Sequence, residues 1–478
     1  MRAAVNKLLL ETKAEKLAAW SAGARFDEID PESLQQLKIR VLDSLGCAIA
    51  ALDGEPIRPI RALTDELGGD GPCTLIGGGR APLDRAAFYN GALVRYLDFM
   101  DFTCVTGQTF HASDNLGSVL SAAEQADASG KDFLTALAVA YQVQTVLSEK
   151  SPLQERGFDH VTQLAYSITA GVARALGLGP VETANAIGVN GCALNALWAV
   201  RTGRLSHWKG LASANVGKAA THGVLLAARG ITGPLNVFEG PMGFEGSVGH
   251  GFELDWRSQR LDAVRRSSVK KYNAEAHSQS ALEAILELRS EHGLKADQVQ
   301  RVELEVFKQL LNAIGGGEAG DKTIVESKEQ ADHSINYLVA VALLDGDVYP
   351  AQFKPERVLA RDVQDLLQRV WPRRSDELTH RYPAELPVRI AVVLNDGLVL
   401  VREKGDYEGY PSRPQTWERV VRKFDRLTER FADDRLRGHI VDTVGGLEAI
   451  DTRALTELLG QVSVPGPEAP GPEARSRP

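Results

Sequence analysis

Most of the first ~260 residues consist of segments in which apolar residues recur at helical spacing. The segment 32–52 is an example, because Leu37, Val41 and Leu45 recur there every four residues and would share one helix face. Further helices are predicted over 86–97, 116–126, 133–146, 161–176, 181–193 and 211–228. Several of these segments are rich in alanine and glycine, which let helices approach closely. The sequence therefore predicts a large, tightly packed helical domain.

The pattern changes near residue 265, after which helical and strand-like segments alternate. The expected elements are helices over 278–291 and 335–344 and strands over 299–307, 388–394 and 398–403. The last two strands are separated by an Asn-Asp-Gly sequence, which is typical of a hairpin turn. Residues 266–405 are therefore expected to form a smaller α+β domain.

Helical spacing returns after Pro414, where Val420, Phe424 and Leu427 form one stripe. The predicted fold is mainly α with an inserted α+β lid. Its helical domain is discontinuous, with residues 1–265 and 406–463, and the lid covers residues 266–405. Residues 464–478 are rich in proline and charge, so this tail is expected to be disordered.

Charge and cysteine content exclude several classes of protein. The 54 Lys and Arg residues are outnumbered by 63 Asp and Glu residues, giving a net charge of −9, which argues against a sequence-independent nucleic-acid binder. The four cysteines are scattered without zinc or iron–sulfur spacing, as expected for a reducing cytoplasm. The N-terminal sequence has only a three-residue leucine run, too short for a signal peptide or a membrane span. We expect a cytoplasmic protein with no membrane partner.

The segment 97–115 is the first candidate site. A helix is expected to end near Asp101, and a polar loop containing Thr103 and His111 follows it. Together with Asp98, these side chains could converge on a small molecule at the ends of helices, where backbone N–H groups attract anions. The alternative is a loop with capping residues, Ser113 or Asp114 among them, and a surface histidine.

Two further candidates lie at the starts of predicted helices. His160 follows Asp159, and the alternative to a functional role is a helix cap with a half-buried histidine. Lys209 follows a tryptophan at the start of a long helix and could bind a carboxylate; Arg201 is nearby. For both cations the alternative is a solvated side chain.

The predicted domain junction carries a dense set of polar groups. Lys271 and His277 lie within the segment 270–277, and domain junctions are preferred places for ligand pockets. A solvated turn is the alternative. His333 and Tyr337 are spaced i,i+4 and would share a helix face, unless the tyrosine is a core residue.

Familiar cofactor motifs are not found in the sequence. The Gly-Gly-Gly-Arg run at 77–80 is not followed by the Gly-Lys-Ser/Thr of a phosphate-binding loop, and is expected to be a turn. No dinucleotide-binding, zinc-protease or serine-hydrolase motif occurs. We therefore expect no nucleotide cofactor and no metal.

Taken together and in this order, the segments resemble the MmgE/PrpD family, which includes iron-independent 2-methylcitrate dehydratases and cis-aconitate decarboxylases. The resemblance rests on VLDSLGCAIAAL, NGALVRYLDFMD, FHASDNLGSVLSAA, GFDHV, SHWKGLASANVGKAATHG, KKYNAEAHSQSALEA and ADHSINYLVAVALLDG. It implies a large helical domain with an inserted α+β lid, an active site in the cleft between them, and a homodimer. The loop between Asp98 and His111 is one residue longer than in the usual pattern, and Ala112 stands where proline is usual.

The resemblance also implies the residues of the site. The implied catalytic residues are His111, His277, His160, Asp98 and Tyr337, and the implied substrate-binding residues are Lys209, Lys271, Thr103 and Asp101. No cofactor or metal is implied. We expect the lid to move relative to the helical domain and so bring the two sets of residues together.

The chemistry of a tricarboxylate dehydratase suits these residue types. Removal of a proton next to a carboxylate needs a base near neutral pKa, cations for the developing charge, and an acid for the leaving hydroxyl. Histidine suits either proton-transfer role, and His111 and His277 are the expected pair, with their individual roles open. Decarboxylation of cis-aconitate and isomerisation of a polycarboxylate need the same carboxylate clamp and remain alternatives, as does a non-catalytic binding protein.

Overall fold

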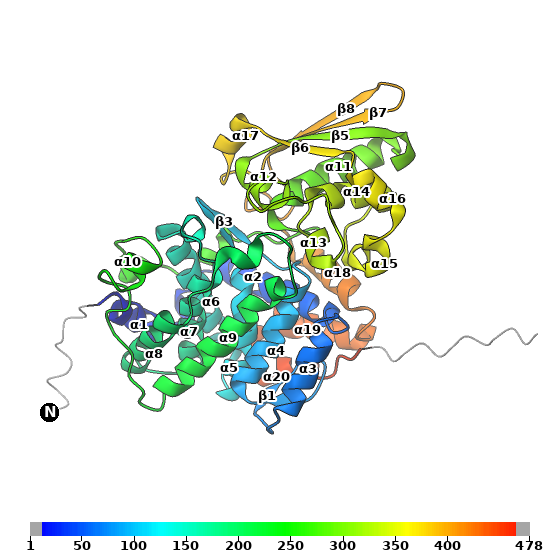
Figure 1. Ribbon diagram of the computed structural model, residues 1–478. Coiled ribbons are helices and arrows are strands. Elements are labelled where there is room, and N and C mark those ends of the chain that lie inside the picture. Colours follow the sequence, from blue (N-terminus) through cyan, green and yellow to red (C-terminus); the bar gives the residue numbers. More distant parts are fainter. Residues whose placement is uncertain (1–11, 465–478) are drawn as a thin grey trace, which may run out of the picture.

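The computed structural model describes residues 12–464 and shows a large helical part that carries a smaller α+β part (Figure 1). Of the tail predicted to be disordered, residues 465–478 lie outside the described residues. The helical part is built from α1 (Lys13–Gly23), α2 (Pro31–Ala50), α3 (Ile57–Glu66), α4 (Leu83–Tyr96), α5 (Leu116–Gln125), α6 (Gly130–Lys150), α7 (Val161–Ala175), α8 (Pro180–Ala193), α9 (Trp208–Ala227) and α10 (Phe244–Ser247). Across residues 12–464, no helix combines the length and apolar character that a membrane crossing requires.

Small residues bring the helices of this part close together, as the sequence predicts. α5 packs against α4, and a Cβ atom added to Gly117 would lie 2.5 Å from the backbone nitrogen of Gly91. A Cβ atom added to Gly223 in α9 would lie 2.0 Å from the side-chain oxygen of Asn190 in α8. Both distances are far below van der Waals contact, so these helix pairs require glycine at the point of approach.

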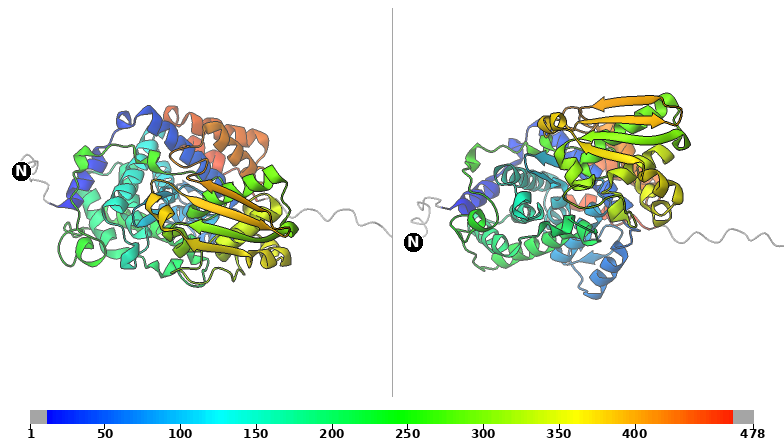
Figure 2. Two further views of the ribbon diagram at one scale, coloured as in Figure 1. Left: turned by 90° about the horizontal axis from the view of Figure 1, so that it is seen from above. Right: turned by 45° about the horizontal axis from the view of Figure 1, so that its top comes forward.

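The α+β part is organised around one four-stranded sheet in the order β6-β5-β7-β8. The strands are β5 (Val299–Val306), β6 (Val370–Arg374), β7 (Val388–Leu394) and β8 (Val399–Lys404). β5 and β6 are parallel, whereas β7 pairs antiparallel with both β5 and β8, so the predicted hairpin is confirmed. The strands lie side by side at the outer surface, away from the helical part (Figure 2).

Helices of the α+β part cover the inner face of this sheet. The helices of this part are α11 (Gln279–His292), α12 (Lys308–Ile314), α13 (Lys328–Ala331), α14 (Ile335–Asp345), α15 (Pro355–Val358), α16 (Arg361–Leu367) and α17 (Asp376–Arg381), and only some of them touch the sheet. α11 packs on β7 and β8, and α14 packs on β6 and on α11. The inward residues of β5, such as Val302 and Leu304, are fully buried beneath them.

The last helices return to the helical part, which makes the α+β part an insertion. They are α18 (Trp417–Thr428), α19 (Asp434–Gly445) and α20 (Thr452–Leu459), and α18 packs on α2. Buried apolar residues accordingly form two clusters, one from both ends of the chain and one from residues 272–410 with Phe102. The fold is thus mainly α with a smaller α+β region, while the boundaries 265/266 and 405/406 stay a prediction.

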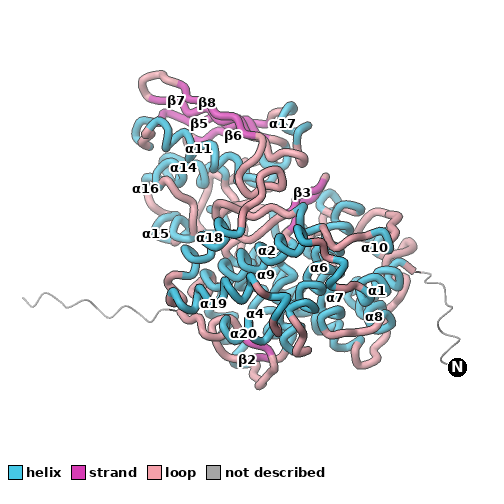
Figure 3. The backbone as a smooth tube through the Cα atoms, turned by 180° about the vertical axis from the view of Figure 1, so that it is seen from behind, coloured by secondary structure: helices cyan, strands magenta, loops and turns pink. Residues whose placement is uncertain are grey.

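The segment between α4 and α5 differs from the expected loop. α4 ends at Tyr96, and β3 (Thr103–Val105) and β4 (Gln108–Phe110) form a short hairpin at the junction of the two parts (Figure 3). Ser113 lies in a 3-10 turn before α5 and donates to Asp101 at 2.6 Å, so it does not cap that helix. The expected helix end near Asp101 and the cap at Ser113 or Asp114 are therefore wrong.

Candidate active site

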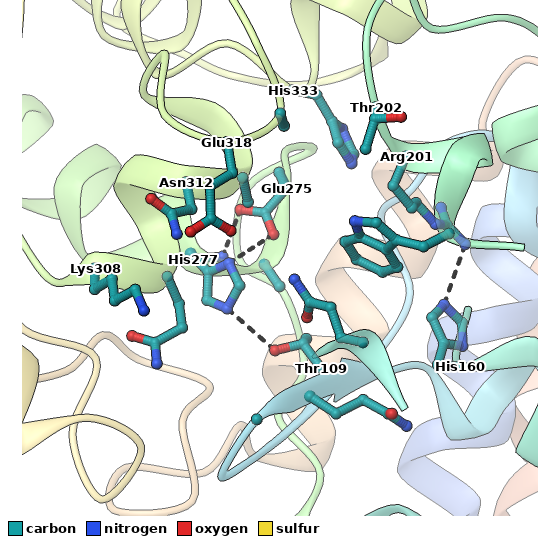
Figure 4. Close-up of a pocket in the computed structure, with 18 of the residues that line it drawn as sticks. Thr109, His160, Arg201, Thr202, Glu275, His277, Lys308, Asn312, Glu318 and His333 are labelled. Atoms are coloured by element: carbon teal, nitrogen blue, oxygen red, sulfur yellow. Dashed lines mark hydrogen bonds and ion pairs between the residues drawn. The ribbon is translucent and has the colours of Figure 1, made fainter. Parts of the chain in front are cut away.

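A cavity of about 390 Å³ lies between the helical part and the α+β part. Side chains from both parts face it, as Figure 4 shows for the labelled residues. Its polar lining includes Arg95, Asp98, Thr109, His111, His160 and Arg201 from the helical part, and Glu275, His277, Lys308, Asn312, His333 and Tyr382 from the α+β part.

On the α+β side, His277 forms an ion pair with a carboxylate. Glu275 caps the short 3-10 turn Ala276–Ser278 that precedes α11, and His277 lies within this turn, with its Nδ1 2.9 Å from Glu275 Oε1. Burial disfavours the imidazolium, yet Glu275 and the neighbouring Cys104 together outweigh burial and raise the pKa of His277 to about 10. The ring is therefore a cation at neutral pH.

The other nitrogen of His277 faces hydroxyl groups. Nε2 lies 3.1 Å from Thr109 Oγ1 (Figure 4). The Tyr382 hydroxyl lies 3.3 Å from the same nitrogen. Phe307 and the Tyr382 ring stack on each other beside the imidazole. Because Nδ1 faces Glu275, Nε2–H is the proton that can be given to a ligand.

On the helical side, His111 is held in the opposite protonation state, as a neutral ring. Its Nδ1 lies 2.7 Å from the backbone oxygen of Asp101, which can only accept, so Nδ1 carries the hydrogen. Burial, with Arg95 and Lys270 nearby, holds the pKa of His111 well below its usual range. His111 is therefore a neutral imidazole whose Nε2 has a free lone pair.

His160 lies beside His111, with ring centroids 5.5 Å apart. Its Nε2 accepts a hydrogen bond of 3.1 Å from Arg201, and burial together with Arg201 lowers the pKa of His160 to about 3 despite the carboxylate of Asp159. Arg201 in turn donates to Asp159 at 2.8 Å. This wall thus presents a neutral histidine and a fixed guanidinium.

Asp98 anchors the floor of the cavity. It has a left-handed backbone (φ 58°), an uncommon conformation for a non-glycine residue, and it accepts from Arg95 at 2.7 Å, Lys270 at 2.8 Å and Lys209 at 3.0 Å. Burial favours the neutral acid, but these three cations hold the pKa of Asp98 well below its usual range. Asp98 is thus a permanent carboxylate that orients cations, and it is unsuited to donating a proton.

The same network continues into the α+β part. Lys209 Nζ contacts both Asp98 and Asp332 at 3.0 Å, and Lys328 contacts Asp332 at 2.7 Å. His333 Nδ1 lies 2.7 Å from Asp332, and burial together with Lys209 lowers the pKa of His333 to about 4. Lysine ammonium groups therefore tie the two parts together beside the cavity.

Asp98, Asp332 and His333 have ligand atoms within 4.8 Å of one another, the kind of grouping that can hold a metal ion. The two carboxylates, however, already share the Lys209 ammonium. Arg95, Lys270 and Lys328 contact the same two residues. Their negative charge is therefore neutralised by side chains, which does not suit a divalent cation.

The structure brings four of the residues proposed from the sequence to the cavity: Asp98, His111, His160 and His277. Lys209 lies directly behind Asp98 and contacts it without lining the cavity. Contacts across the junction are already formed, since Thr109 meets His277 and Lys209 meets Asp332. The arrangement therefore needs no lid movement to bring the two walls together.

Two lid residues lie elsewhere. Lys271 points away from the cavity, with Nζ 3.3 Å from Glu283 and 3.4 Å from Glu408. Tyr337 is fully buried, and its hydroxyl donates to the backbone oxygen of Gln352. Neither lines the cavity, so the structure does not support the substrate-binding role of Lys271 or the catalytic role of Tyr337.

The two remaining loop residues are also outside the cavity. Asp101 accepts from Ser113 at 2.6 Å and from the Tyr141 hydroxyl at 2.8 Å, which engages both carboxylate oxygens in holding the loop. Thr103 is buried in β3. We therefore assign Asp101 to positioning the His111 loop and leave Thr103 out of the site.

Sequence reasoning missed several residues of the cavity. Glu275 could have been found from its spacing, because a carboxylate two residues before a histidine can reach its ring. Arg95 sits one helical turn before Asp98, another local signal. Tyr382 carried no such signal, because its contact with Thr109 and with His277 depends on folding alone.

Comparison with known proteins agrees with this architecture. Residues 15–257 match the MmgE/PrpD N-terminal domain and residues 272–445 match the MmgE/PrpD C-terminal domain. The chain is 30% identical to a 2-methylcitrate dehydratase of Cupriavidus necator, over 75% of this chain and 78% of that protein.

Other relatives have related names. A 2-methylcitrate dehydratase of Escherichia coli K12 is 29% identical over 69% of this chain and 71% of that protein. An alkylcitrate dehydratase of a fungal species is 26% identical over 85% of each chain. These matches show a lyase of the dehydratase kind that belongs to the MmgE/PrpD family.

Proposed function

We propose that this enzyme dehydrates 2-methylcitrate, or a closely related tricarboxylate such as citrate, to the corresponding cis-aconitate-type product, without iron. The observation that carries the proposal is that two histidines in opposite protonation states face one cavity. His277 holds a proton through its pair with Glu275, while His111 holds a free lone pair. The names of the relatives support the choice of substrate class.

The two histidines divide the reaction between them. His111 Nε2 removes the proton from the carbon next to a substrate carboxylate, and the released electron pair forms the new double bond. The C–OH bond breaks as His277 Nε2–H protonates the leaving oxygen, and water departs. His111 is left protonated and His277 neutral, so one net proton transfer between them through water resets the site.

Cations on both walls hold the substrate carboxylates. Arg201 lines the helical wall with its position fixed by Asp159, and Lys308 lines the α+β wall. Positive charge near the carboxylate stabilises the negative charge that builds up when the α-proton leaves. The buried Asp98 holds Arg95 in the cavity lining and Lys209 behind it, and both cations add positive charge near the substrate.

Two observations support a reaction without iron. Within residues 12–464, the grouping able to hold a metal contains no cysteine and is already neutralised by lysine and arginine. Protonation of the leaving hydroxyl by the His277 imidazolium supplies what a Lewis acid would otherwise supply.

The test is incubation of the purified enzyme with 2-methylcitrate, citrate and cis-aconitate in the presence of EDTA. We expect loss of water from a hydroxy-tricarboxylate, detected as ultraviolet absorbance of the new double bond and by mass spectrometry. Release of CO₂ from cis-aconitate would instead identify a decarboxylase. Failure of every hydroxy-tricarboxylate to form an unsaturated product would contradict the proposal.

We further propose a homodimer in the cytoplasm. Large apolar side chains remain exposed on the helical part, among them Val181, Leu197, Trp208, Ile231 and Met242. Such exposure suits burial against a second copy. The four cysteines are unpaired, as in a reducing compartment. Sedimentation at micromolar concentration tests the homodimer. A single species of 51.7 kDa, the mass of the monomer, would contradict it.

A further inference from the structure

A second cavity, of about 220 Å³, lies at the junction of the two parts and shares no lining residue with the first. Its lining is strongly basic. Six of its lining residues are cationic, namely Lys270, Lys271, Arg419, Arg422, Lys423 and Arg426, and one, Glu408, is acidic.

Four of these cations contact carboxylates outside the lining: Lys270 contacts Asp98, Lys271 contacts Glu283, Lys423 contacts Asp43 and Arg426 contacts Asp347. Glu408 is shared by two cations, because both Lys271 and Arg419 contact it. Arg422 is exposed on α18 and has no acidic side chain within ion-pair distance in residues 12–464. Arg422 therefore adds a positive charge that no described carboxylate neutralises within ion-pair distance, beside a space large enough for a small molecule.

Lys423 and Arg426 are held in place by partners behind them. Lys423 is buried and lies 2.7 Å from Asp43 in α2, while Arg426 stacks on the ring of Tyr349 and pairs with Asp347. Lys423 Nζ also donates to the backbone oxygens of Phe99 and Lys270, so its charge is fixed in place behind the cavity. The exposed Arg419 and Arg422 are the cations that an arriving anion would contact.

The cavity lies where the chain passes twice between the two parts. Lys270 and Lys271 belong to the first crossing, and Glu408 belongs to the second. The crossings are bonded to each other, because Val269 N–H donates to the backbone oxygen of Gly409 at 3.0 Å. A Cβ atom at Gly409 would lie 2.1 Å from the Val269 oxygen, so this close approach requires glycine.

We propose that this cavity binds a small multivalent anion bearing carboxylate or phosphate groups, and that the anion ties both crossings to α18. Guanidinium groups bind such oxyanions through paired hydrogen bonds, and Arg419, Arg422 and Arg426 provide three on one helix. The first crossing also leads to the active site, because Lys270 Nζ contacts Asp98 there. Occupancy of the cavity thus stiffens the connection that positions the α+β wall.

Titration calorimetry of the full chain with inorganic pyrophosphate, at constant ionic strength, tests binding. We expect saturable binding of one equivalent, weakened at least tenfold in the double variant Arg419→Gln/Arg422→Gln. Arg435→Gln, which removes an exposed charge from α19, is the matched control and should bind as the wild type does. Equal affinity in the double variant, or heat that never saturates, would overturn the proposal.

The two anion chemistries are separated by a second titration with propane-1,2,3-tricarboxylate, which lacks a hydroxyl group. Loss of one of two binding events in the double variant would show that the cavity accepts carboxylates. A tricarboxylate isotherm unchanged by the variant, with pyrophosphate binding weakened, would restrict the ligand to phosphate.

Hydrogen exchange tests the mechanical part of the proposal. With pyrophosphate, we expect slower amide exchange in 268–272 and 406–416 in the wild type and no change in the double variant. Both arginines are exposed, so without the anion the two proteins should unfold at the same temperature. Saturable binding without slower exchange in either crossing would refute the stiffening role.

Discussion

The two walls of the active-site cavity use the same residue type in opposite ways. On the α+β wall, His277 is paired with a carboxylate through Nδ1 and its pKa is raised to about 10. On the helical wall, His111 donates Nδ1–H to a backbone oxygen, and burial with nearby Arg95 and Lys270 holds its pKa well below the usual range. One wall therefore offers a proton and the other a lone pair.

The difference comes from the partners and not from burial, because both rings are buried. A carboxylate beside a buried imidazole stabilises the cation, whereas a backbone oxygen fixes the tautomer without adding a charge. Pairs of titratable groups whose surroundings separate their pKa values are the arrangement that acid–base catalysis needs. The comparison of the two walls therefore supports His277 as the proton donor and His111 as the proton acceptor.

The largest effect is expected from removing the proton donor. His277→Gln should lower kcat by ~10²–10⁴ with little change in KM, because a general acid acts in the transition state and contributes little to substrate binding. Steady-state kinetics on the identified substrate measures both constants. His292→Gln, an exposed histidine at the end of α11, is the control and should retain wild-type kinetics. A raised KM with normal kcat would instead make His277 a binding residue.

Removing the proton acceptor should have an effect of about 10²-fold or more on kcat. In His111→Gln the amide cannot take a proton, while its side chain can still reach the Asp101 backbone oxygen. Exchange of the substrate α-hydrogen with deuterated water separates the two histidines. We expect His111→Gln to abolish exchange and His277→Gln to retain part of it. Normal exchange in His111→Gln would move the base to another residue.

The third prediction concerns a variant in which His277 becomes a neutral imidazole, like His111 on the other wall. Glu275→Gln removes the group that raises the pKa of His277 most, so this pKa should fall from about 10 toward the ordinary value of roughly 6.5. The proton needed by the leaving group is then lost as pH rises past that value, and activity at pH 8 should drop roughly thirtyfold. A pH–rate profile measures the shift of the alkaline limb. An unchanged limb would show that Glu275 does not set the charge of His277.

Local signals in the sequence account for most of the fold. Helical spacing located α2 and α4 to α9 within a few residues, and the Asn-Asp-Gly turn located the β7–β8 hairpin. β6 was not predicted because its five residues, Val-Trp-Pro-Arg-Arg, have no alternating apolar pattern and lie at the edge of the sheet. Its parallel pairing with β5 joins segments far apart in the chain, which no local pattern encodes.

Cavity residues that lie in short local motifs were predicted from the sequence. Errors arose where the course of the backbone determines which of two side chains reaches the cavity. Lys270 and Lys271 are neighbours, and only the antiparallel bridge between Phe102 and Ser268 fixes which side chain reaches Asp98. The i,i+4 argument for His333 and Tyr337 fails because α14 starts at Ile335, after His333. His333 thus faces the cavity while the tyrosine enters the core of the α+β part.

The smallest effect is expected from Tyr337, which lies in the core of the α+β part and does not line the cavity. Tyr337→Phe removes a hydroxyl that donates to the backbone oxygen of Gln352 and leaves the ring packed beside Phe353. The loss of one hydrogen bond should lower the free energy of unfolding by about 1 kcal/mol. Because the hydroxyl does not line the cavity, kcat and KM should stay within about twofold of the wild type. Denaturant unfolding and steady-state kinetics on the same preparation check both values. A fall in kcat of tenfold or more without loss of stability would return Tyr337 to the catalytic set, and the cavity would then extend further into the α+β part than its lining residues indicate.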